Sequence, residues 1–446
     1  MRTSLIKLAA IALLGVSIAA ESSADGEVQR YSLQQAIDYA LDNSPEIGGM
    51  QARIDQADAQ LGEALAAFYP QIKASLSYQH SDNPSQAFAM IIAQRRLDFN
   101  GGDFNHPGGV DNYRPQVTAS YSLFRGGQDY YRKRAAELGI ESSELEKAVT
   151  RSHLVNNVTA AYYGYLAAQD AHRISQRSIE AVESELQQSR IRFDAGVLLK
   201  SDVLSLEVQL AEAKDAEIQA ANAIELAKAM LKTLLGMPSG QELVLAESEQ
   251  PSPAAPDTFD GLLNQALARQ PELQAAEKRV AIAEQQLNAA EAAHLPRADA
   301  FVSYGSDSKD LAFSSNRDNV TAGVMVEVDV FSGFATQEKI KKAEHELTAA
   351  REAARQTRLR IEQQVKTAHL KLLEALSRQQ VAAAAVRAAE EALRLVNEQR
   401  QAGVVTVTRY IEVEVARDKA NARDIAARYD ALRAEADLKQ ATGFWN

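Results

Sequence analysis

Apolar and polar residues alternate strictly in four short stretches of the chain. Their apolar members are Ile72, Ala74, Leu76 and Tyr78; then Val117, Ala119, Tyr121 and Leu123; then Ala298, Ala300, Val302 and Tyr304; and then Ala322, Val324, Val326, Val328 and Val330. A period of two predicts β-strands that have one apolar and one polar face. We therefore expect strands at about 72–80, 115–124, 297–305 and 320–331.

Two long stretches of the chain have the composition of helices. Proline is absent from 116–237 and from every position after 296, and both stretches are rich in Ala, Glu, Gln, Leu, Lys and Arg. Proline costs about 3 kcal/mol inside a helix, whereas these residues favour it. We expect helices at about 127–195, 199–236, 335–402 and 406–442. The two longest would span about 100 Å each, too long for one globular core, so we expect paired helices that form coiled-coil hairpins at about 127–236 and 335–442.

The chain is duplicated. Residues 32–78 align without a gap on 258–304, a shift of 226 (258 − 32). Residues 124–236 align without a gap on 331–443, a shift of 207 (331 − 124). Each copy predicts one helix–strand–strand–long helix–turn–helix unit, which is far longer than the 20–50 residues typical of solenoid repeats.

The duplication also divides the chain. We place the first unit at 25–237, the second at 258–446, and a linker that contains several prolines at 238–257. The first copy has 19 additional residues (226 − 207) between its two aligned blocks, and they fall within 80–114. Proline and glycine are frequent there, so this segment is expected to be a long loop at the rim of the strands.

Four amphipathic strands separated by long helices leave two architectures open. One is a small sandwich whose apolar faces turn inward. The other is a transmembrane β-barrel, whose strands have about 9–11 residues and alternate between lipid and lumen. Open sheet edges are not tolerated in lipid, so a barrel requires several copies of the chain: two would give eight strands, three twelve, and four sixteen.

The N-terminus predicts export. Arg2 and Lys7 precede an apolar stretch of about 13 residues and then small residues, which is typical of a signal peptide, and we place it at 1–24. The formal charge of −12 becomes −13 without this segment (−12 − 1). Such a charge argues against nucleic acid as a partner and is compatible with a protein that lines a water-filled path.

The chain offers no constellation for chemistry. It has no cysteine, which excludes disulfide bonds and thiolate metal sites, and its seven histidines are scattered without metal-ligand spacing. Neither a nucleophile elbow nor a phosphate loop nor a dinucleotide-binding fingerprint occurs. We therefore expect no enzyme activity, no metal and no cofactor.

The two turns of the helical hairpins carry the candidate functional residues. Gly196 and Gly403 supply the left-handed residue that ends a helix, and Asp202, Arg409 and Glu412 follow within about three helical turns. Ordinary surface charge near a helix start explains these residues equally well. In a ring of copies, however, they would form belts of charge around an axis, and a constriction held closed by ionic contacts is the functional alternative.

In its motifs the chain resembles the outer-membrane efflux protein family, the TolC-like outer membrane factors. The resemblance covers nearly all of the mature chain and depends on the two tandem units and on their turn segments. These segments are RFDAGV at 192–197 with SDVL at 201–204, and RQAGV at 400–404; the strand-to-helix junctions LFRGG at 123–127 and VFSG at 330–333 are similar to the family too.

The resemblance implies a fold and a location. Members are homotrimers, so twelve strands would form one barrel in the lipid bilayer of the outer membrane of a Gram-negative bacterium. Twelve helices would form a coiled-coil tunnel across the periplasm, where most of the mass would lie. The fold class is thus mainly α with a membrane β-barrel.

The resemblance also implies a passive exit duct of a tripartite efflux pump or type I secretion system. A periplasmic adaptor protein would open the tunnel at its tip, near Gly196, Val197, Gly403 and Val404, and an inner-membrane transporter would supply energy. Family tips are commonly closed by aspartates and their partners.

Two positions in the second copy bear on the closure of the tip. Asp202 matches the aspartate of the first copy, whereas Arg409 stands where an aspartate is common and Glu412 where an acidic residue often stands.

The alternative functions are a periplasmic coiled-coil adaptor, which has one hairpin between compact β-rich modules, and a structural protein of the envelope.

Overall fold

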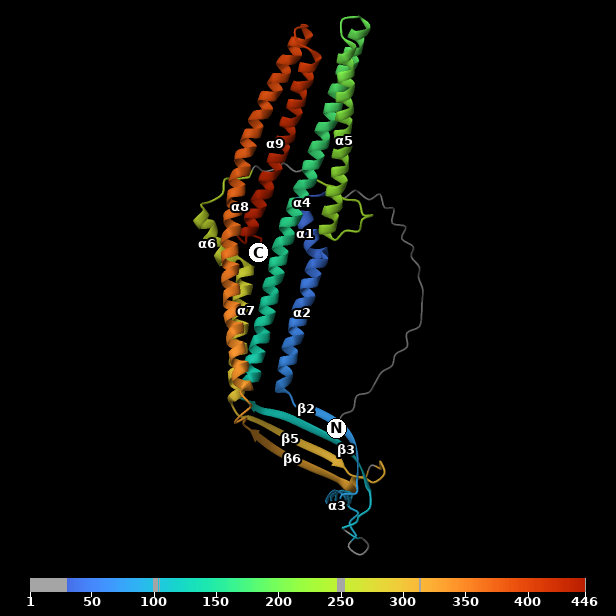
Figure 1. Cartoon of the computed structure of the whole chain (residues 1–446), viewed down its shortest axis with the longest axis vertical. Helices are drawn as coiled ribbons and strands as arrows, with labels where there is room; N and C mark the ends of the chain where they lie inside the picture. Colours follow the sequence, from blue (N-terminus) through green and yellow to red (C-terminus); the bar gives the residue numbers. More distant parts are fainter. Residues whose placement is uncertain (1–29, 99–102, 104, 247–252, 313, 446) are drawn as a thin grey trace, which may run out of the picture.

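A computed structural model describes residues 30–98, 103, 105–246, 253–312 and 314–445. The expected signal peptide lies outside the described residues, as does part of the expected linker. The molecule is elongated, with a β-sheet at one end and two helical hairpins that end in separate turns at the other (Figure 1). None of the helices within the described residues is both long enough and apolar enough to cross a membrane.

Two hairpins of long helices make up most of the length. They consist of α4 (Gln128–Asp194) with α5 (Lys200–Leu235), and of α8 (Ala335–Gln401) with α9 (Val407–Ala441). Since α4 and α8 have 67 residues each, they extend about 100 Å at 1.5 Å per residue. The bounds agree with the expected helices to within one or two residues, because proline-free stretches of good helix formers have no earlier point at which to stop.

The single helix expected ahead of the strands in each copy is divided in two. The pairs are α1 (Leu33–Asn43) with α2 (Pro45–Leu65), and α6 (Phe259–Arg269) with α7 (Pro271–Glu291). In each case a proline occupies the first position of the second helix, where its missing N–H has no intrahelical partner. The proline also pushes the preceding residue, Ser44 or Gln270, out of the helical conformation.

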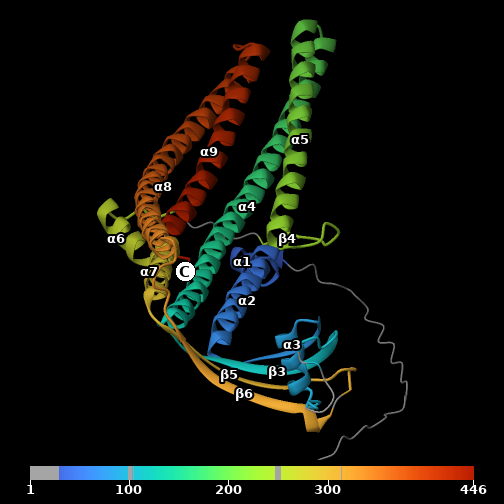
Figure 2. The same ribbon diagram turned by 60° about the horizontal axis from the view of Figure 1, so that its bottom comes forward.

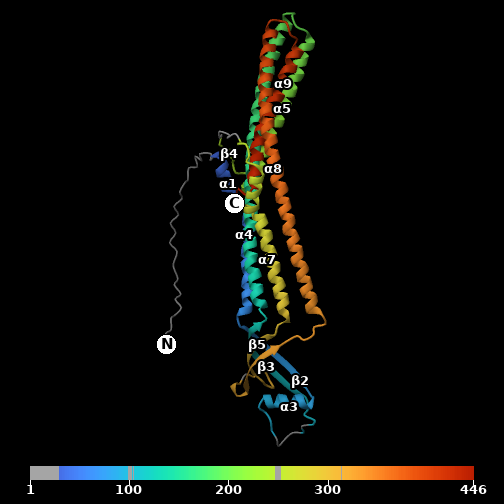
Figure 3. The same cartoon turned by 90° about the vertical axis from the view of Figure 1, so that its left-hand side faces the viewer.

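Four helices form a curved wall beside the sheet. In this half of the molecule α2, α4, α7 and α8 pack in that order, side by side (Figure 1). Ion pairs cross the seams: Lys278 of α7 lies 2.5 Å from Glu141 of α4, and Arg351 of α8 lies 3.1 Å from Glu284 of α7. In the side view α8 diverges from α4 and α7 toward the sheet, so the wall is curved rather than flat (Figure 3). Its outer members, α2 and α8, each have a free side.

A second layer of packing surrounds the middle of the wall. There α1 and the short parallel strands β1 (Arg30–Tyr31) and β4 (Val244–Leu245) cover one side of α4, α5 and α9. On the other hairpin, α6 covers α8 and α9. These two apolar clusters fix both hairpins to the wall, and most of the fully buried large side chains lie in them or beside them.

The sheet has four antiparallel strands in the order β2-β3-β5-β6. They are β2 (Gln71–Ser81), β3 (Val110–Arg125), β5 (Arg297–Ser306) and β6 (Asp318–Glu327). The register places the alternating apolar residues of all four strands on one face, for example in the row Ile72, Ala119, Val302 and Ala322. The opposite face carries the polar residues, for example the row Lys73, Thr118, Ser303 and Thr321.

The apolar face of the sheet is uncovered. Ile72, Leu76, Val324 and Val326 expose 75%, 58%, 64% and 66% of their surface. A soluble protein rarely exposes a contiguous apolar patch of this kind. The sandwich alternative is therefore wrong for the described chain, since a sandwich would turn this face inward.

The strands and their connections differ from the expected ones in three places. A bulge between Ser122 and Phe124 puts Phe124, rather than Leu123, opposite Ala298 on the apolar face. β6 ends at Glu327, so Val328 and Val330 lie beyond the strand although they continue the alternation. The segment 80–114, expected to be a loop throughout, contains helix α3 (Pro84–Ala93) and the first residues of β3.

Candidate functional site at the hairpin tips

The tips of the hairpins are built by their glycines. Gly196 and Gly403 have φ values of +80° and +75°, which favour glycine over any residue with a side chain. The N–H of the following residue, Val197 or Val404, bonds back to the last turn of the long helix at 3.0 and 2.9 Å. Both valines are more than 70% exposed, at the far end of the molecule from the sheet (Figure 1).

The three predicted gate residues are not brought together within this chain. Arg409 lies 3.0 Å from Glu412, one turn further along α9, and both side chains are about 60% exposed. Asp202 lies half-buried in the first turn of α5, and its carboxylate has no hydrogen-bond or ion-pair partner among the described residues. An exposed pair on one helix contributes about 0.3–0.5 kcal/mol, so Arg409 and Glu412 do not hold two hairpins together.

A buried ionic network joins the last turn of α8 to α4 close to the tips. Glu185 of α4 forms an ion pair with Arg400 of α8, and each side chain is only 7% exposed. The hydroxyl of Ser189 donates to Glu185 at 2.9 Å. Removing one partner of this buried pair costs more than removing one partner of the exposed pair, since the remaining partner would be left charged and unpaired.

The network continues along α9. The Arg400 guanidinium lies 4.8 Å from the ring centre of Tyr410, and the Tyr410 hydroxyl hydrogen-bonds to Glu414. Arg417 lies 2.8 Å from Glu414, which is 2% exposed. We call Glu185, Arg400, Tyr410, Glu414 and Arg417 the buried clamp.

Asp418 attaches the clamp to α4 a second time. It lies 2.7 Å from Arg417 and accepts a hydrogen bond of 2.7 Å from Ser178 of α4. Both helices of the second hairpin are therefore tied to α4 by buried or half-buried polar contacts.

Burial dominates the acid–base properties of the clamp. Desolvation raises the pKa of the Glu414 carboxyl, and the hydrogen bond from Tyr410 and the charge of Arg417 only partly oppose it. Burial likewise raises the pKa of the Tyr410 hydroxyl, helped by the carboxylates of Glu414 and Glu185. Oε2 of Glu414 has no hydrogen-bond partner among the described residues.

The clamp was not among the predicted sites, because charged residues on a long helix are normally solvated. One signal was present: Ser178, Val182, Glu185 and Ser189 follow heptad spacing, and all four are buried against the neighbouring hairpin. A charged residue within such a stripe predicts a buried partner.

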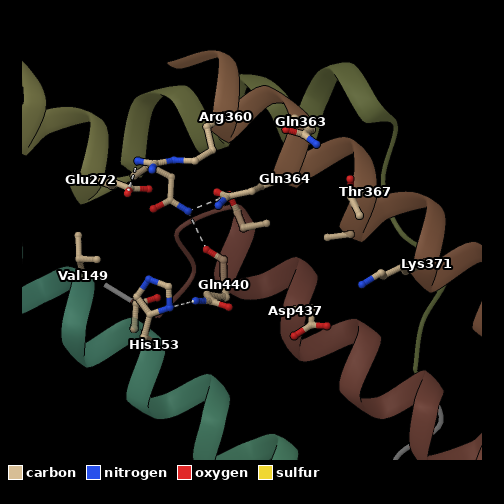
Figure 4. Close-up of a pocket in the computed structure, with 14 residues that line it drawn as sticks. Val149, His153, Glu272, Arg360, Gln363, Gln364, Thr367, Lys371, Asp437 and Gln440 are labelled. Atoms are coloured by element: carbon tan, nitrogen blue, oxygen red, sulfur yellow. Dashed lines mark hydrogen bonds and ion pairs between the residues drawn. The ribbon is translucent and has the colours of Figure 1, made fainter. Parts of the chain in front are cut away.

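A polar recess of about 650 Å³ lies between α4, α8 and the end of α9 (Figure 4). The Gln270 side chain donates to the carbonyls of Gln440 and Ala441 at 2.8 and 2.9 Å, and His153 of α4 lies 2.6 Å from the Gln440 side chain. These contacts cap the C-terminus of α9 and fix it to the start of α7. No group of metal-ligating side chains occurs within the described residues, here or elsewhere.

Comparison with known proteins identifies the fold. The sequence pattern of the family described as "Outer membrane efflux protein" matches residues 36–237 and 262–444. The chain belongs to the outer membrane efflux protein family. It is therefore an outer-membrane protein of a family of channels, and the family pattern matches it twice, once in each half.

Individual relatives agree with this assignment. Protein CyaE of Bordetella pertussis is 30% identical over 336 residues, which are 74% of this chain and 66% of CyaE. Outer membrane protein TolC of Escherichia coli is 22% identical over 97% of this chain and 86% of TolC. The outer membrane channel CmeC of Campylobacter jejuni superposes with a TM-score of 0.78 at 16% identity, over 92% of this chain and 85% of CmeC. The fold, barrel strands with a helical tunnel, is that of these channels.

The raised pKa of Glu414 predicts how stability depends on pH. Between the usual glutamate value of about 4.5 and the raised pKa, the unfolded chain binds fewer protons than the folded chain, so stability falls as pH rises. Glu414→Gln cannot titrate. The Tm of this variant minus the Tm of the parent should therefore increase as pH rises through this window, and it should be constant below the window.

Thermal denaturation between about pH 4 and 8 measures this difference, and other carboxylates cancel in it. Glu412→Gln, at the exposed partner of Arg409, is the matched control, and its Tm difference from the parent should change less with pH. A difference for Glu414→Gln that is independent of pH would contradict the assignment.

Proposed function

We propose that this chain is the outer-membrane channel of a tripartite efflux pump or type I secretion system, a passive exit duct rather than an enzyme. One observation carries the proposal: a sheet with an exposed apolar face and two unpaired edges is continued by helical hairpins about 100 Å long. We further propose that residues 1–24 are the signal peptide, and that 25–237 and 258–446 are the two repeats.

The proposed assembly is a homotrimer. β2 and β6 each have one edge without a strand partner among the described residues, and pairing β6 of one copy with β2 of the next removes both edges. Three copies then supply twelve strands, and the family resemblance favours three over two or four. In the same ring the free side of α8 meets the free side of α2.

Apolar stripes on the hairpins support this arrangement. α5 exposes Leu204, Val208, Ile218, Leu226 and Met230, and α8 exposes Leu359, Leu370, Leu373, Val381 and Leu395; each side chain is between 41% and 70% exposed. Each set follows one side of its helix at 3.6 residues per turn. We propose that neighbouring copies cover both stripes, apart from Leu204 and Val208 next to the tip, and so complete the wall of the tunnel.

The tips are the proposed docking site of a periplasmic adaptor. Val197 and Val404 are exposed there beside Gly196 and Gly403, and a groove between α5 and α9 leads away from them. Val208, Ile411 and Val415 line this groove. Glu412 and Lys419 line it too, so it presents apolar surface together with two opposite charges. An amphipathic helix of the adaptor suits such a groove.

Closure of the resting tip requires contacts between copies as well as the buried clamp. We propose that the unpaired carboxylate of Asp202 meets Arg409 of an adjacent hairpin, drawing Arg409 away from Glu412. Contacts of the adaptor would compete for these groups and shift the tip toward an open state. The energy for transport would come from an inner-membrane transporter. The relatives differ in name, so we assign no cargo.

A first prediction concerns the gate. Arg409→Ala and Asp202→Ala should each raise single-channel conductance in planar bilayers and admit larger antibiotics into intact cells, because each removes a contact between copies. Arg400→Ala should raise conductance further, because removing one partner of a buried pair costs about 3–5 kcal/mol and so loosens the tip. Lys342→Ala, an exposed residue of α8 far from the tips, is the control. Unchanged conductance in both Arg409→Ala and Asp202→Ala would place the constriction elsewhere and leave the fold untouched.

A second prediction concerns the lipid face. Arginine at Leu76 or Val326 should cost roughly 2–4 kcal/mol near the bilayer midplane. Arginine at Ser75, whose side chain lies on the polar face, should lower the free energy of unfolding only slightly. Urea titration of the protein folded into lipid vesicles measures the free energies, and mass measurement in detergent checks the trimer. A larger cost at Ser75 than at Leu76 would mean that the polar face, not the apolar face, meets lipid. A stable folded monomer in membranes would exclude the trimer.

A further inference from the structure

Helix α3 is a folded feature that only the first copy of the repeat contains. Asn83 caps its N-terminus by accepting from Ser85 N at 3.1 Å, and Pro84 occupies its first position. It lies at the end of the sheet away from the long helices (Figure 2), which is the outer end of the strands in the proposed channel.

The register shows which face of the sheet α3 covers. Its buried residues Ala87 and Met90 pack on Val110, the first residue of β3. Side chains alternate along a strand, so Val110 and Asn112 lie on the same face as Gln116 and Thr118. This is the polar face, opposite to the exposed apolar one. In a barrel whose apolar face meets lipid, α3 therefore lies inside the mouth.

Buried polar contacts hold the helix there. Gln94, the residue that ends α3, is fully buried and donates to the Asp111 carbonyl at 2.7 Å and to Asn112 Oδ1 at 2.9 Å. Asn112 donates to Asp307 Oδ1 at 2.7 Å, and Asn319 donates to Asp307 Oδ2 at 3.1 Å. Asp307 is 1% exposed. This chain of contacts crosses β3, β5 and β6, so α3 is fixed to three strands.

The other side of α3 is uncovered and, apart from Ser85, apolar. Ala89 and Ile92 lie opposite Ala87 and Met90 around the helix, and Ile92 is 46% exposed. Because the buried side rests on the barrel wall, this side is directed away from the wall, toward the lumen. An apolar surface in a water-filled mouth is stabilised when another apolar surface covers it.

The dimensions indicate the partner. Twelve strands about 4.8 Å apart, tilted by about 40°, close into a barrel about 24 Å across between backbones. A helix 10–12 Å in diameter that rests on this wall covers most of the distance of about 12 Å from the backbone of the wall to the axis. One α3 from each of three copies would therefore leave little open space in the mouth, with their uncovered sides near the axis.

We propose that α3 is an inward-folded plug helix, and that three of them narrow the outer mouth of the channel and set the size of what passes. This inference rests on the proposed function, since it requires three copies around one axis. It goes beyond that function, because it places a second constriction at the end of the channel opposite to the tips.

The absence of cysteine from the chain allows a direct test. In the full-length Ile92→Cys protein, mild oxidation should link two copies into a dimer on non-reducing gels, and reductant should reverse the link. Reaction with a bulky maleimide should lower single-channel conductance severalfold. Leu76→Cys, on the lipid face of the same barrel, is the control and should neither cross-link nor change conductance.

The outcomes separate the two proposals. If Ile92→Cys trimers conduct but neither cross-link nor respond to the maleimide, α3 does not reach the axis; the plug is then excluded while the channel stands. If the parent protein neither trimerises in detergent nor conducts, the proposed function fails and the plug fails with it. Should Ile92→Cys disturb folding, Ala89→Cys on the same side of α3 provides the same readout.

Discussion

The open edges of the sheet are the constraint on which the rest of this structure depends. β2 and β6 each leave a row of backbone N–H and C=O groups without a strand partner in the described chain. In lipid each unsatisfied group costs several kcal/mol, so only a closed ring of copies is stable there. Because the long helices begin where the strands end, the symmetry of the ring extends along their length. In the proposed trimer this symmetry accounts for the uncovered stripes of α5 and α8, and it would bring three sets of tips around one axis.

The two copies of the repeat share a fold but differ at the functional ends. Arg400 and Tyr410 of the buried clamp correspond, at the shift of 207, to Phe193 and Val203, and Glu185 corresponds to Ala392. Only one clamp therefore exists per chain, and it ties the second hairpin to the first. The plug helix, in contrast, belongs to the first copy, since the 19 additional residues lie there. The two copies therefore share a scaffold but differ in the residues that form the clamp and helix α3.

The parts that depend on periodicity could be predicted from the sequence. Strands with an apolar face repeat every two residues and long helices lack proline, so their positions and the glycine turns between them follow from local rules. The bulge at Phe124 and the end of β6 could not be predicted, because pairing with β5 determines both. Helix α3 is short and lies among prolines and glycines, where its Asn83–Pro84 start was the only local signal. The clamp depends on which residues face another helix, which spacing indicates only once the packing is known.

The use of charge rather than apolar contact in the clamp has a physical consequence for the tips. Forming a buried ion pair removes two charges from water, and breaking it restores their hydration, so the net cost of separation is smaller than the strength of the contact suggests. An apolar clamp of equal area would hold the hairpins together more firmly, with no such compensation on opening. The raised pKa of Glu414 shows that its carboxylate is incompletely stabilised where it lies. For the gate that we propose, which holds at rest and separates when an adaptor docks, the charged arrangement is better suited than the apolar one.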